Sequence, residues 1–263
     1  MKLLDGKVAI VTGAGKGIGK DIAISFGEMG ASVVCVARSI GDIEDTAEQI
    51  RSFGSSALAV VCDVTKEDQL KNLVDQVLKK FKGIDILINN AGGSPPVDAA
   101  SASPRLTEKI VALNLVAPLV LSQQAHGALS VNDSPGCIVN IASVSGVRPS
   151  PGTAAYGAAK AGLLSSTRSL AMEWGPKIRV NAIVVGLVHN DAGIAHYGGA
   201  EGFQRVADML PLKRMAAPED VANAVLMLCD DKAAYISGAA LEVDGGGEVP
   251  VFLHLASEAS KAD

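Results

Sequence analysis

Residues 8–19 read VAIVTGAGKGIG, an apolar run that ends in a glycine-rich turn. Val8–Thr12 has the composition of a buried strand, and a helical pattern begins directly after the turn. Glycines at such a turn let the backbone approach a pyrophosphate, whose charge meets the N–H groups and the positive dipole end of the helix. A closely packed strand–helix turn has the same glycines, but a loop placed after the first strand of an alternating chain favours a dinucleotide site. The residues expected to line this site are Gly13, Gly15, Lys16, Gly17, Ile18 and Gly19.

Strands and helices are expected to alternate from one end of the chain to the other. The predicted strands are Val8–Thr12, Ser32–Val36, Ala57–Cys62, Ile84–Asn89, Cys137–Ala142, Ile178–Val184 and Ala240–Val243. Helical periodicity marks Asp42–Phe53, Glu67–Phe81, Leu106–Leu129, Thr153–Trp174 and Pro218–Cys229. Continuous apolar strands are typical of a parallel sheet covered on both faces, and the alternation implies right-handed crossovers. We expect one α/β domain over residues 1–263: a Rossmann-type, doubly wound, parallel seven-stranded sheet with helices on both faces.

Three segments depart from this rhythm. Leu187–Leu210 contains four glycines and is long for a connection, which predicts a mobile lid near the carboxyl ends of the strands. Val249–Leu255 is apolar and is expected to pack against a partner subunit or to close the pocket of a neighbouring subunit. The polar tail Ser257–Asp263 is expected to fray.

Composition narrows the class of protein. Hydrophobic residues make up 48% of the chain, charged residues 19%, and the formal net charge is −5. These values favour a large core and give no support to nucleic-acid binding. The four cysteines are widely spaced, which predicts reduced core thiols and no metal site. No cleavable signal is evident, and no apolar stretch is judged long enough to span a membrane, so we expect a cytoplasmic protein with neither nucleic acid nor membrane as a partner.

The end of the second predicted strand bears on the choice of cofactor. Sites that prefer NAD usually carry an acid there, which binds the ribose 2′-hydroxyl. Residues 36–39 read VARS and contain no carboxylate. Arg38 offers a planar guanidinium to a 2′-phosphate, and Lys16 offers a second cation. We therefore expect NADP(H) to be preferred; NAD(H) remains possible if Arg38 only stacks on the adenine and Lys16 is a solvated surface charge.

Three polar residues form a candidate catalytic centre. Tyr156 and Lys160 are four residues apart on a predicted helix, so they lie on one face. A neighbouring ammonium is expected to lower the pKa of the phenol toward the value that suits an acid/base catalyst. Ser143 follows a predicted strand at the carboxyl edge of the sheet, where its hydroxyl can steady a substrate oxygen that gains charge.

The chain resembles the short-chain dehydrogenase/reductase family over essentially its whole length. The matching motifs are Thr-Gly-x-x-x-Gly-x-Gly, Cys62-Asp63-Val64, Asn89-Asn90-Ala91-Gly92, Asn114, Ser143, Tyr156-x-x-x-Lys160 and Asn181 through Gly186. The resemblance implies hydride transfer between the nicotinamide and a carbonyl or secondary alcohol, with Tyr156 donating or accepting the substrate proton. It also implies a homodimer or homotetramer.

The resemblance further implies roles for individual residues. Lys160 would hold the nicotinamide ribose, and Asn114 would keep a water that relays protons to solvent. The cofactor contacts carried over outside the glycine loop are Asp63 and Val64 at the adenine, Asn90, Ala91 and Gly92 in the cleft, and Gly186, Val188 and Asn190 near the nicotinamide. More ordinary roles also fit single residues: Asp63 as the cap of a turn, Asn89 and Asn90 as turn formers, and Asn114 as a polar helix residue.

One departure from the family pattern concerns the nicotinamide side. The family usually has Pro-Gly and, four residues later, Thr; this chain has Val185-Gly186 and Asn190. Asn190 can still bond a carboxamide, and the Val188 N–H group is a second candidate. Without the proline the loop is less constrained.

The residues expected around the reacting carbon indicate the substrate class. They are Gly93, Ser94, Pro95, Val144, Val147, Val185, His189, Ile194, His196 and Tyr197. No Arg or Lys is evident among them, which favours a mostly apolar ketone or alcohol: alicyclic, steroid-like or an acyl thioester. Both histidines are expected at the rim of the lid. The alternatives are an NAD-linked alcohol dehydrogenase of the same family and a non-catalytic nucleotide sensor.

Overall fold

A computed structural model describes residues 2–132, 134–189 and 197–251. The strands are β1 (Val8–Thr12), β2 (Ser32–Ala37), β3 (Ala57–Val61), β4 (Ile86–Asn89), β5 (Gly136–Ile141), β6 (Ile178–Val185) and β7 (Ala240–Val243). They form one sheet in the order β3-β2-β1-β4-β5-β6-β7, and every neighbouring pair is parallel. The expected doubly wound α/β fold is confirmed, and all seven predicted strands are present.

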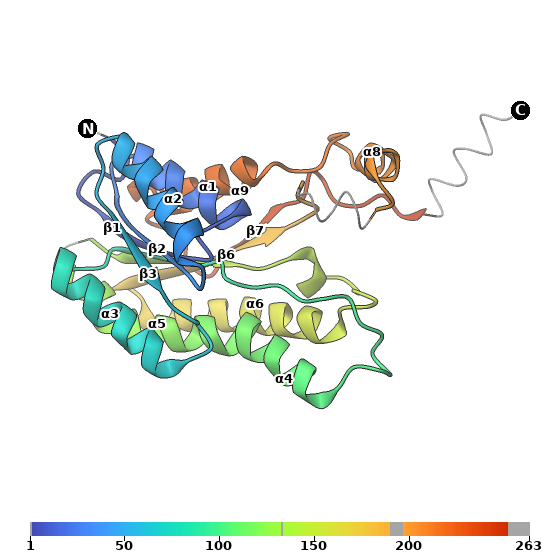
Figure 1. Ribbon diagram of the computed structural model, residues 1–263, viewed down its shortest axis with the longest axis horizontal. Helices are drawn as coiled ribbons and strands as arrows, with labels where there is room; N and C mark the ends of the chain where they lie inside the picture. Colours follow the sequence, from blue (N-terminus) through green and yellow to red (C-terminus); the bar gives the residue numbers. More distant parts are fainter. Residues whose placement is uncertain (1, 133, 190–196, 252–263) are drawn as a thin grey trace, which may run out of the picture.

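Helices cover both faces of the sheet (Figure 1). One face carries α1 (Gly17–Glu28), α2 (Ile40–Ser52) and α9 (Pro218–Cys229), and the other carries α3 (Glu67–Phe81), α4 (Pro104–Val111), α5 (Ala117–Leu129) and α6 (Ala154–Trp174). Each face has its own buried cluster, with Phe26 of α1 in one and Leu121 of α5 in the other. Because β1, β4 and β5 are buried along their whole length, the β-branched runs are needed on both faces.

The single helix expected over Leu106–Leu129 is wrong in detail. The structure starts a helix at Pro104, capped by the Ser103 hydroxyl, and breaks the regular pattern with a π-helical turn over Ala112–Val116 before α5 begins. The turn carries Asn114, whose side chain bonds to a distant loop. A long-range contact of this kind leaves no trace in the helical period of the sequence.

The same stretch corrects the expectation that no segment is long enough to span a membrane. Pro104–Leu129 passes that test by length and hydropathy. Its residues Leu121, Ala125 and Leu129 nevertheless belong to the core beneath the sheet, and Asn89 of β4 donates to the hydroxyl of Ser122. The apolar composition of this stretch is therefore accounted for by its place in the fold.

The expected lid contains regular structure. α8 (Ala200–Met209) occupies its second half, and the small cluster of Ala207, Leu210 and Met215 packs beneath it. Hydrogen bonds from the Ala216 N–H to the Leu187 carbonyl and from the His189 N–H to the Ala216 carbonyl anchor its first residues. Asn190, Ile194 and His196 lie outside the described residues, as do most of Val249–Leu255 and all of Ser257–Asp263.

Candidate active site

The glycine loop after β1 is interlocked with the loop after β4. The Thr12 hydroxyl accepts hydrogen bonds from the N–H groups of Asn90 and Ala91 at 2.9 and 3.0 Å, and the Asn90 amide returns a bond to the Thr12 carbonyl at 2.8 Å. A Cβ on Gly19 would lie 2.3 Å from the Gly13 carbonyl oxygen and 2.4 Å from the Asn90 amide nitrogen. Glycine is therefore required at Gly19, where α1 crosses the loop at van der Waals distance.

The amino end of α1 fits a phosphate. Lys16 occupies the N-cap position in extended conformation, its own side chain makes no capping hydrogen bond, and the first turn of the helix holds no acid. The orphan N–H groups and the positive dipole end of α1 are thus directed at the space above the loop. Together with the close backbone approach at Gly19, this is the arrangement a dinucleotide pyrophosphate requires.

Arg38 and Asp63 flank the expected adenine side. Arg38 is exposed directly after β2. The Thr65 hydroxyl and N–H donate to the Asp63 carboxylate at 2.7 and 3.0 Å. These bonds, with a smaller contribution from the Arg38 charge, hold the pKa of Asp63 below its usual value although burial opposes them. Asp63 thus caps the turn before α3, and its contact with an adenine remains a prediction.

Ser143, Tyr156 and Lys160 are brought together at the carboxyl edge of β5. Ser143 caps the short helix η2 (Val144–Gly146), and its hydroxyl lies near enough to Tyr156 on α6 to affect the pKa of the phenol. A Cβ on Gly146 would lie 2.8 Å from the Lys160 carbonyl carbon, so η2 rests directly on the backbone of α6. This contact fixes the position of Ser143 relative to Tyr156.

Lys160 is a buried cation whose ammonium has one hydrogen-bond acceptor among the described residues. Its side chain is 4% exposed, and its ammonium donates to the Ile141 carbonyl at 2.6 Å. Burial lowers the pKa of Lys160 to about 8. An ammonium has three N–H donors, so this group keeps capacity for further acceptors in the cleft.

The expected effect of Lys160 on Tyr156 is wrong for this structure. Burial raises the pKa of Tyr156, and the neighbouring Ser143 side chain opposes the rise. The Lys160 ammonium lies over the Tyr156 ring, 5.5 Å from its centroid, while its hydrogen bond goes to the strand backbone. The free-energy cost of removing a charged phenolate from water is larger than its attraction to an ammonium whose hydrogen bond goes to another group.

Asn114 is buried and its side chain makes three hydrogen bonds. Its amide oxygen accepts from the Gly93 N–H at 2.9 Å, and its amide nitrogen donates at 2.9 Å to the carbonyls of Gly93 and Ile110. The side chain therefore fixes the loop after β4 against the π-helical turn. The expected proton-relaying water at Asn114 remains a prediction.

Sequence reasoning missed a buried polar chain beneath the site. Asn89 is not a turn former: its amide donates to the Asn140 side chain at 2.8 Å and to Ser122 at 3.0 Å. Asn140 of β5 donates in turn to Thr167 of α6 at 2.9 Å. The available signal was a single Asn inside the apolar run of β5, since a buried amide in a central strand needs partners.

The expected nicotinamide side lies at the end of β6. The Gly186 N–H donates to the Val243 carbonyl at 3.0 Å, and Val188 pairs with Ala216 in an isolated parallel bridge. The predicted contacts of Gly186 and Val188 with a carboxamide are not tested by these bonds. His189 is exposed, as expected for a residue at the rim, and its ring packs edge-on against Phe203 with centroids 5.2 Å apart.

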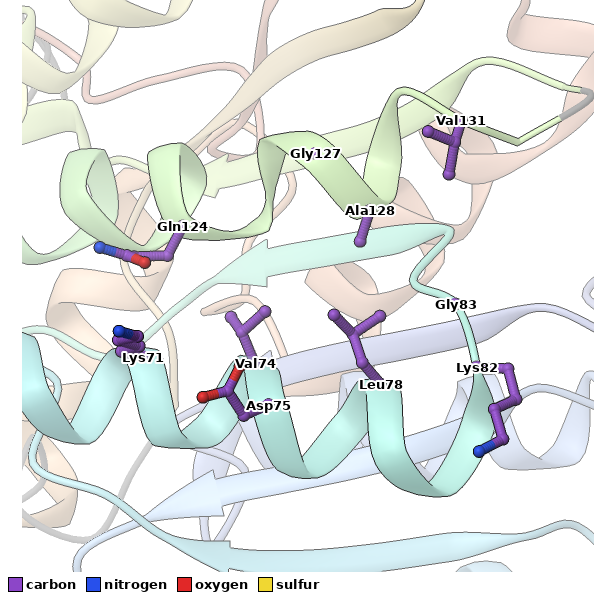
Figure 2. Close-up of a pocket in the computed structure, with 10 residues that line it drawn as sticks. All are labelled: Lys71, Val74, Asp75, Leu78, Lys82, Gly83, Gln124, Gly127, Ala128 and Val131. Atoms are coloured by element: carbon purple, nitrogen blue, oxygen red, sulfur yellow. The ribbon is translucent and has the colours of Figure 1, made fainter.

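A cavity of about 460 Å³ lies between α3 and α5, away from these residues (Figure 2). It is lined by Lys71, Val74, Asp75, Leu78, Lys82, Gly83, Gln124, Gly127, Ala128 and Val131. Several of these lie at the carboxyl ends of the two helices, which in a strand–helix–strand unit face the amino ends of the strands. The cavity therefore lies toward the amino edge of the sheet, whereas Tyr156 lies at the carboxyl edge, and the cavity is not part of the candidate site.

Comparisons with known proteins agree with this geometry. Residues 13–248 match the family model described as Enoyl-(Acyl carrier protein) reductase. The chain is 37% identical to 7alpha-hydroxysteroid dehydrogenase of Escherichia coli (strain K12) over 247 residues, which cover 93% of this chain and 95% of that protein. It is 33% identical to Short-chain dehydrogenase/reductase SDRA of Arabidopsis thaliana over 244 residues, covering 92% and 95%.

A solved structure extends the likeness to three dimensions. It is a 7alpha-hydroxysteroid dehydrogenase complexed with NADH and 7-oxo glycochenodeoxycholic acid, and it matches this fold with a TM-score of 0.88 at 36% identity. The match covers 93% of this chain and 95% of that chain. From the fold, the site and these relatives together, the chain belongs to the short-chain dehydrogenase/reductase family of oxidoreductases.

Proposed function

We propose that this enzyme interconverts a carbonyl and a secondary alcohol with NADP(H), using Tyr156 as the acid/base. The observation that carries the proposal is the meeting of Tyr156 with the Ser143 hydroxyl and with the buried Lys160, whose ammonium lies 5.5 Å from the centre of the Tyr156 ring. All three sit at the carboxyl edge of β5, close to the loops after β1 and β4. Edges of this kind hold the ligands of doubly wound sheets.

The bound nicotinamide supplies or takes up the hydride, and the side chains handle the substrate oxygen and its proton. Since burial raises the pKa of Tyr156, the phenol keeps its proton at neutral pH and is ready to donate it to a carbonyl oxygen. The Ser143 hydroxyl steadies the same oxygen as charge develops. Lys160 would hold ribose hydroxyls with the N–H donors that are not bonded to the Ile141 carbonyl, and Asn114 keeps the loop at Gly93 in place.

The preference for NADP(H) rests on Arg38 and Lys16, two exposed cations beside the glycine loop. Gly13, Gly15, Gly17, Ile18 and Gly19 would surround the pyrophosphate, Asp63 and Val64 the adenine, and Asn90, Ala91, Gly92, Gly186, Val188 and Asn190 the nicotinamide half. NAD(H) is the second candidate, because the structural neighbour is a complex with NADH and because Asp42 lies against Gly15, whose added Cβ would be 2.7 Å from that of Asp42. A carboxylate there opposes a 2′-phosphate.

The cofactor preference is tested by titrating the purified protein with NADPH and NADH. We expect Arg38→Ala to weaken NADPH binding by roughly 10- to 100-fold, the loss expected for a charge-assisted bidentate contact, and to leave NADH binding within about twofold. Asp42→Asn should strengthen NADPH binding, because it removes the opposing charge. An Arg38→Ala variant with unchanged NADPH affinity would reject the preference.

For the substrate we propose a mostly apolar ketone or alcohol of alicyclic, steroid-like or acyl-thioester type. Support comes from the relative named as a hydroxysteroid dehydrogenase and from apolar Val144 and Val147 next to Ser143. We further propose a cytoplasmic homodimer or homotetramer. The described residues include large exposed apolar side chains at Met227 of α9, Tyr235, Ile236 and Leu241 of β7, and all four cysteines are buried free thiols.

The mechanism is tested by Tyr156→Phe against a panel of ketones with NADPH. We expect kcat to fall by about 10²- to 10⁴-fold, the usual worth of a general acid, while the Kd for NADPH stays within about threefold. Tyr235→Phe is the matched control, since Tyr235 is fully exposed at 104% and should keep full turnover. Equal turnover in Tyr156→Phe sinks the mechanism; nucleotide binding without turnover of any ketone favours the sensor.

A further inference from the structure

The loop that joins Ser143 to Tyr156 carries a cation that sequence reasoning did not place at the cleft. Arg148 lies five residues after Ser143, and its backbone N–H donates to the Val144 carbonyl at 3.0 Å. Hydroxyl groups tie the same loop together, because Ser150 donates to Ser145 at 3.0 Å. Arg148 therefore projects from a loop whose two ends are proposed catalytic residues.

The partner of Arg148 comes from the far side of the site. Its guanidinium pairs through Nη2 with Glu248, which is 100 residues further along the chain. Glu248 follows β7, and the same connection touches the end of β6, since a Cβ on Gly186 would lie 2.6 Å from the Cα of Asp244. The sheet order β5-β6-β7 thus makes this ion pair bridge the loops on either side of the proposed nicotinamide position.

A third segment borders the same ion pair. The pKa of Tyr197 is raised by burial, then by the charge of Glu248, and is lowered by that of Arg148. Both charges therefore lie near Tyr197, three residues before α8 begins. The ion pair stands where the connections after β5, β6 and β7 meet above the site.

The hydrogen bonds of Arg148 are incomplete. Nη1 donates to the adjacent Pro149 carbonyl at 3.0 Å and Nη2 serves Glu248, but Nε is buried without an acceptor in the described part of the chain. A buried donor left unpaired is costly, so the position favours an incoming acceptor. Nε and Nη2 form one edge of the guanidinium, and a carboxylate that bonds both makes the bidentate pair that Glu248, bonded at Nη2 alone, does not make.

We propose that Arg148 determines substrate specificity by binding a carboxylate carried by the substrate away from its reacting carbonyl, and that Glu248 is the internal counter-ion which the substrate displaces. The proposal rests on the proposed function and narrows its substrate class to apolar keto acids or hydroxy acids. It differs from the expectation that no Arg or Lys is aimed at the residues around the reacting carbon. Both side chains are 37% exposed, so a ligand can reach the pair from solvent.

The test compares matched ligands. Alicyclic and steroid-like keto acids, among them 7-oxo glycochenodeoxycholic acid, are each paired with the corresponding primary amide, which has nearly the same shape without the charge. For each pair we measure kcat/KM with NADPH and, by calorimetry, the Kd for the protein saturated with NADP⁺. We expect acids to be preferred roughly three- to tenfold, in the range of a half-exposed ion pair.

Variants assign that preference to the ion pair. Arg148→Gln should bring the acid-to-amide ratio to about 1, and Glu248→Gln should raise it because the internal competitor is lost. Arg51→Gln is the matched control: Arg51 pairs with Glu44 on the exposed side of α2, so its loss should leave the ratio unchanged. A wild-type ratio of 1, or a preference that survives Arg148→Gln, overturns the inference. Binding without turnover of any ligand rejects the proposed function instead, since the calorimetric ratio still reports on Arg148.

Discussion

The carboxyl edge of the sheet has two halves that are built differently. The half proposed for the nucleotide, called the nucleotide half, is formed by the loops after β1, β2 and β4 and is held by short hydrogen bonds among Thr12, Asn90 and Ala91. The half proposed for the substrate, called the substrate half, is formed by the connections after β5, β6 and β7 and is held by the partly exposed Arg148–Glu248 pair and by the small cluster at α8. Tyr156 and Lys160 lie between the two.

This difference explains what each half can do. The contacts of the nucleotide half are internal and leave little room to adjust, so they suit a ligand of fixed shape such as a dinucleotide. The contacts of the substrate half are partly solvated, and a ligand that carries its own charge and apolar surface can replace them. Rigidity at one half and replaceable contacts at the other are consistent with a constant cofactor and an adaptable substrate site.

The largest expected effect lies at the boundary between the halves, where Lys160→Met exchanges a buried cation for an apolar side chain. The fall in the pKa of Lys160 from 10.5 to about 8 corresponds to about 3 kcal/mol of destabilisation while the amine is charged. We expect Lys160→Met to raise the free energy of unfolding at pH 7 by up to that amount, measured by urea denaturation, and to lose turnover.

The pH dependence of this stability difference shows whether the buried charge causes it. Below pH 8 the amine is charged in both the folded and the unfolded chain, so the folded wild type carries the whole penalty. Between pH 8 and 10.5 the folded protein has lost the proton that the unfolded chain keeps, so the stability gap to Lys160→Met should shrink. A gap that stays constant over this range would show that packing, not charge, sets it.

A somewhat smaller effect is expected from Gly19→Ala, which tests the rigidity of the nucleotide half. Its Cβ would meet the Gly13 carbonyl oxygen at 2.3 Å, and hydrogen bonds prevent that loop from yielding. We expect the free energy of unfolding to fall by about 1–3 kcal/mol, the usual cost of overpacking, together with a loss of NADPH affinity.

Gly127→Ala is the control for this substitution. Gly127 of α5 is exposed at the open cavity beside α3, and a Cβ there would meet no described atom outside its own helix backbone within 4 Å. The control should gain roughly 0.5–1 kcal/mol from helix propensity. If Gly19→Ala and Gly127→Ala have the same effect on stability and on NADPH binding, the loop at Gly13 can move to accept a Cβ and the nucleotide half is not rigid.

The strands of the fold were predictable from the sequence, whereas two local features were not. Apolar runs such as Val8–Thr12 predicted the central strands because these are buried on both faces, whereas β7 at the edge of the sheet is largely exposed. The π-helical turn at Asn114 was not predictable from periodicity, since it accompanies hydrogen bonds to Gly93, 21 residues away. The lid helix α8 was missed because its apolar side chains pack in a small separate cluster with residues on both sides of it in the chain, Leu187 and Met215 among them.

The candidate site shows the same limits. The spacing of Tyr156 and Lys160 predicted their shared helix face, and the position of Ser143 after a strand predicted its edge of the sheet. The predicted direction of the pKa shift of Tyr156 was wrong, because burial depends on the whole fold whereas the residue spacing shows only the neighbouring charge. The Arg148–Glu248 pair was missed because sequence gives no register between loops that follow different strands.

The smallest expected effect on global stability, and the sharpest test of the substrate half, is Phe203→Ala in α8. Phe203 packs edge-on against His189 at 5.2 Å and Tyr197 at 6.3 Å between ring centroids, in the cluster separate from the two main cores. We expect α8 to lose protection in hydrogen exchange while the free energy of global unfolding changes by less than about 1 kcal/mol.

Phe26→Ala is the control, since Phe26 is 0% exposed in the main core under α1 and should cost about 3–5 kcal/mol. If Phe203→Ala costs as much as Phe26→Ala, the substrate half folds as one unit with the rest of the sheet. Contacts around the substrate would then be as firmly fixed as those around the nucleotide, and displacement of Glu248 by a ligand would require the whole domain to yield.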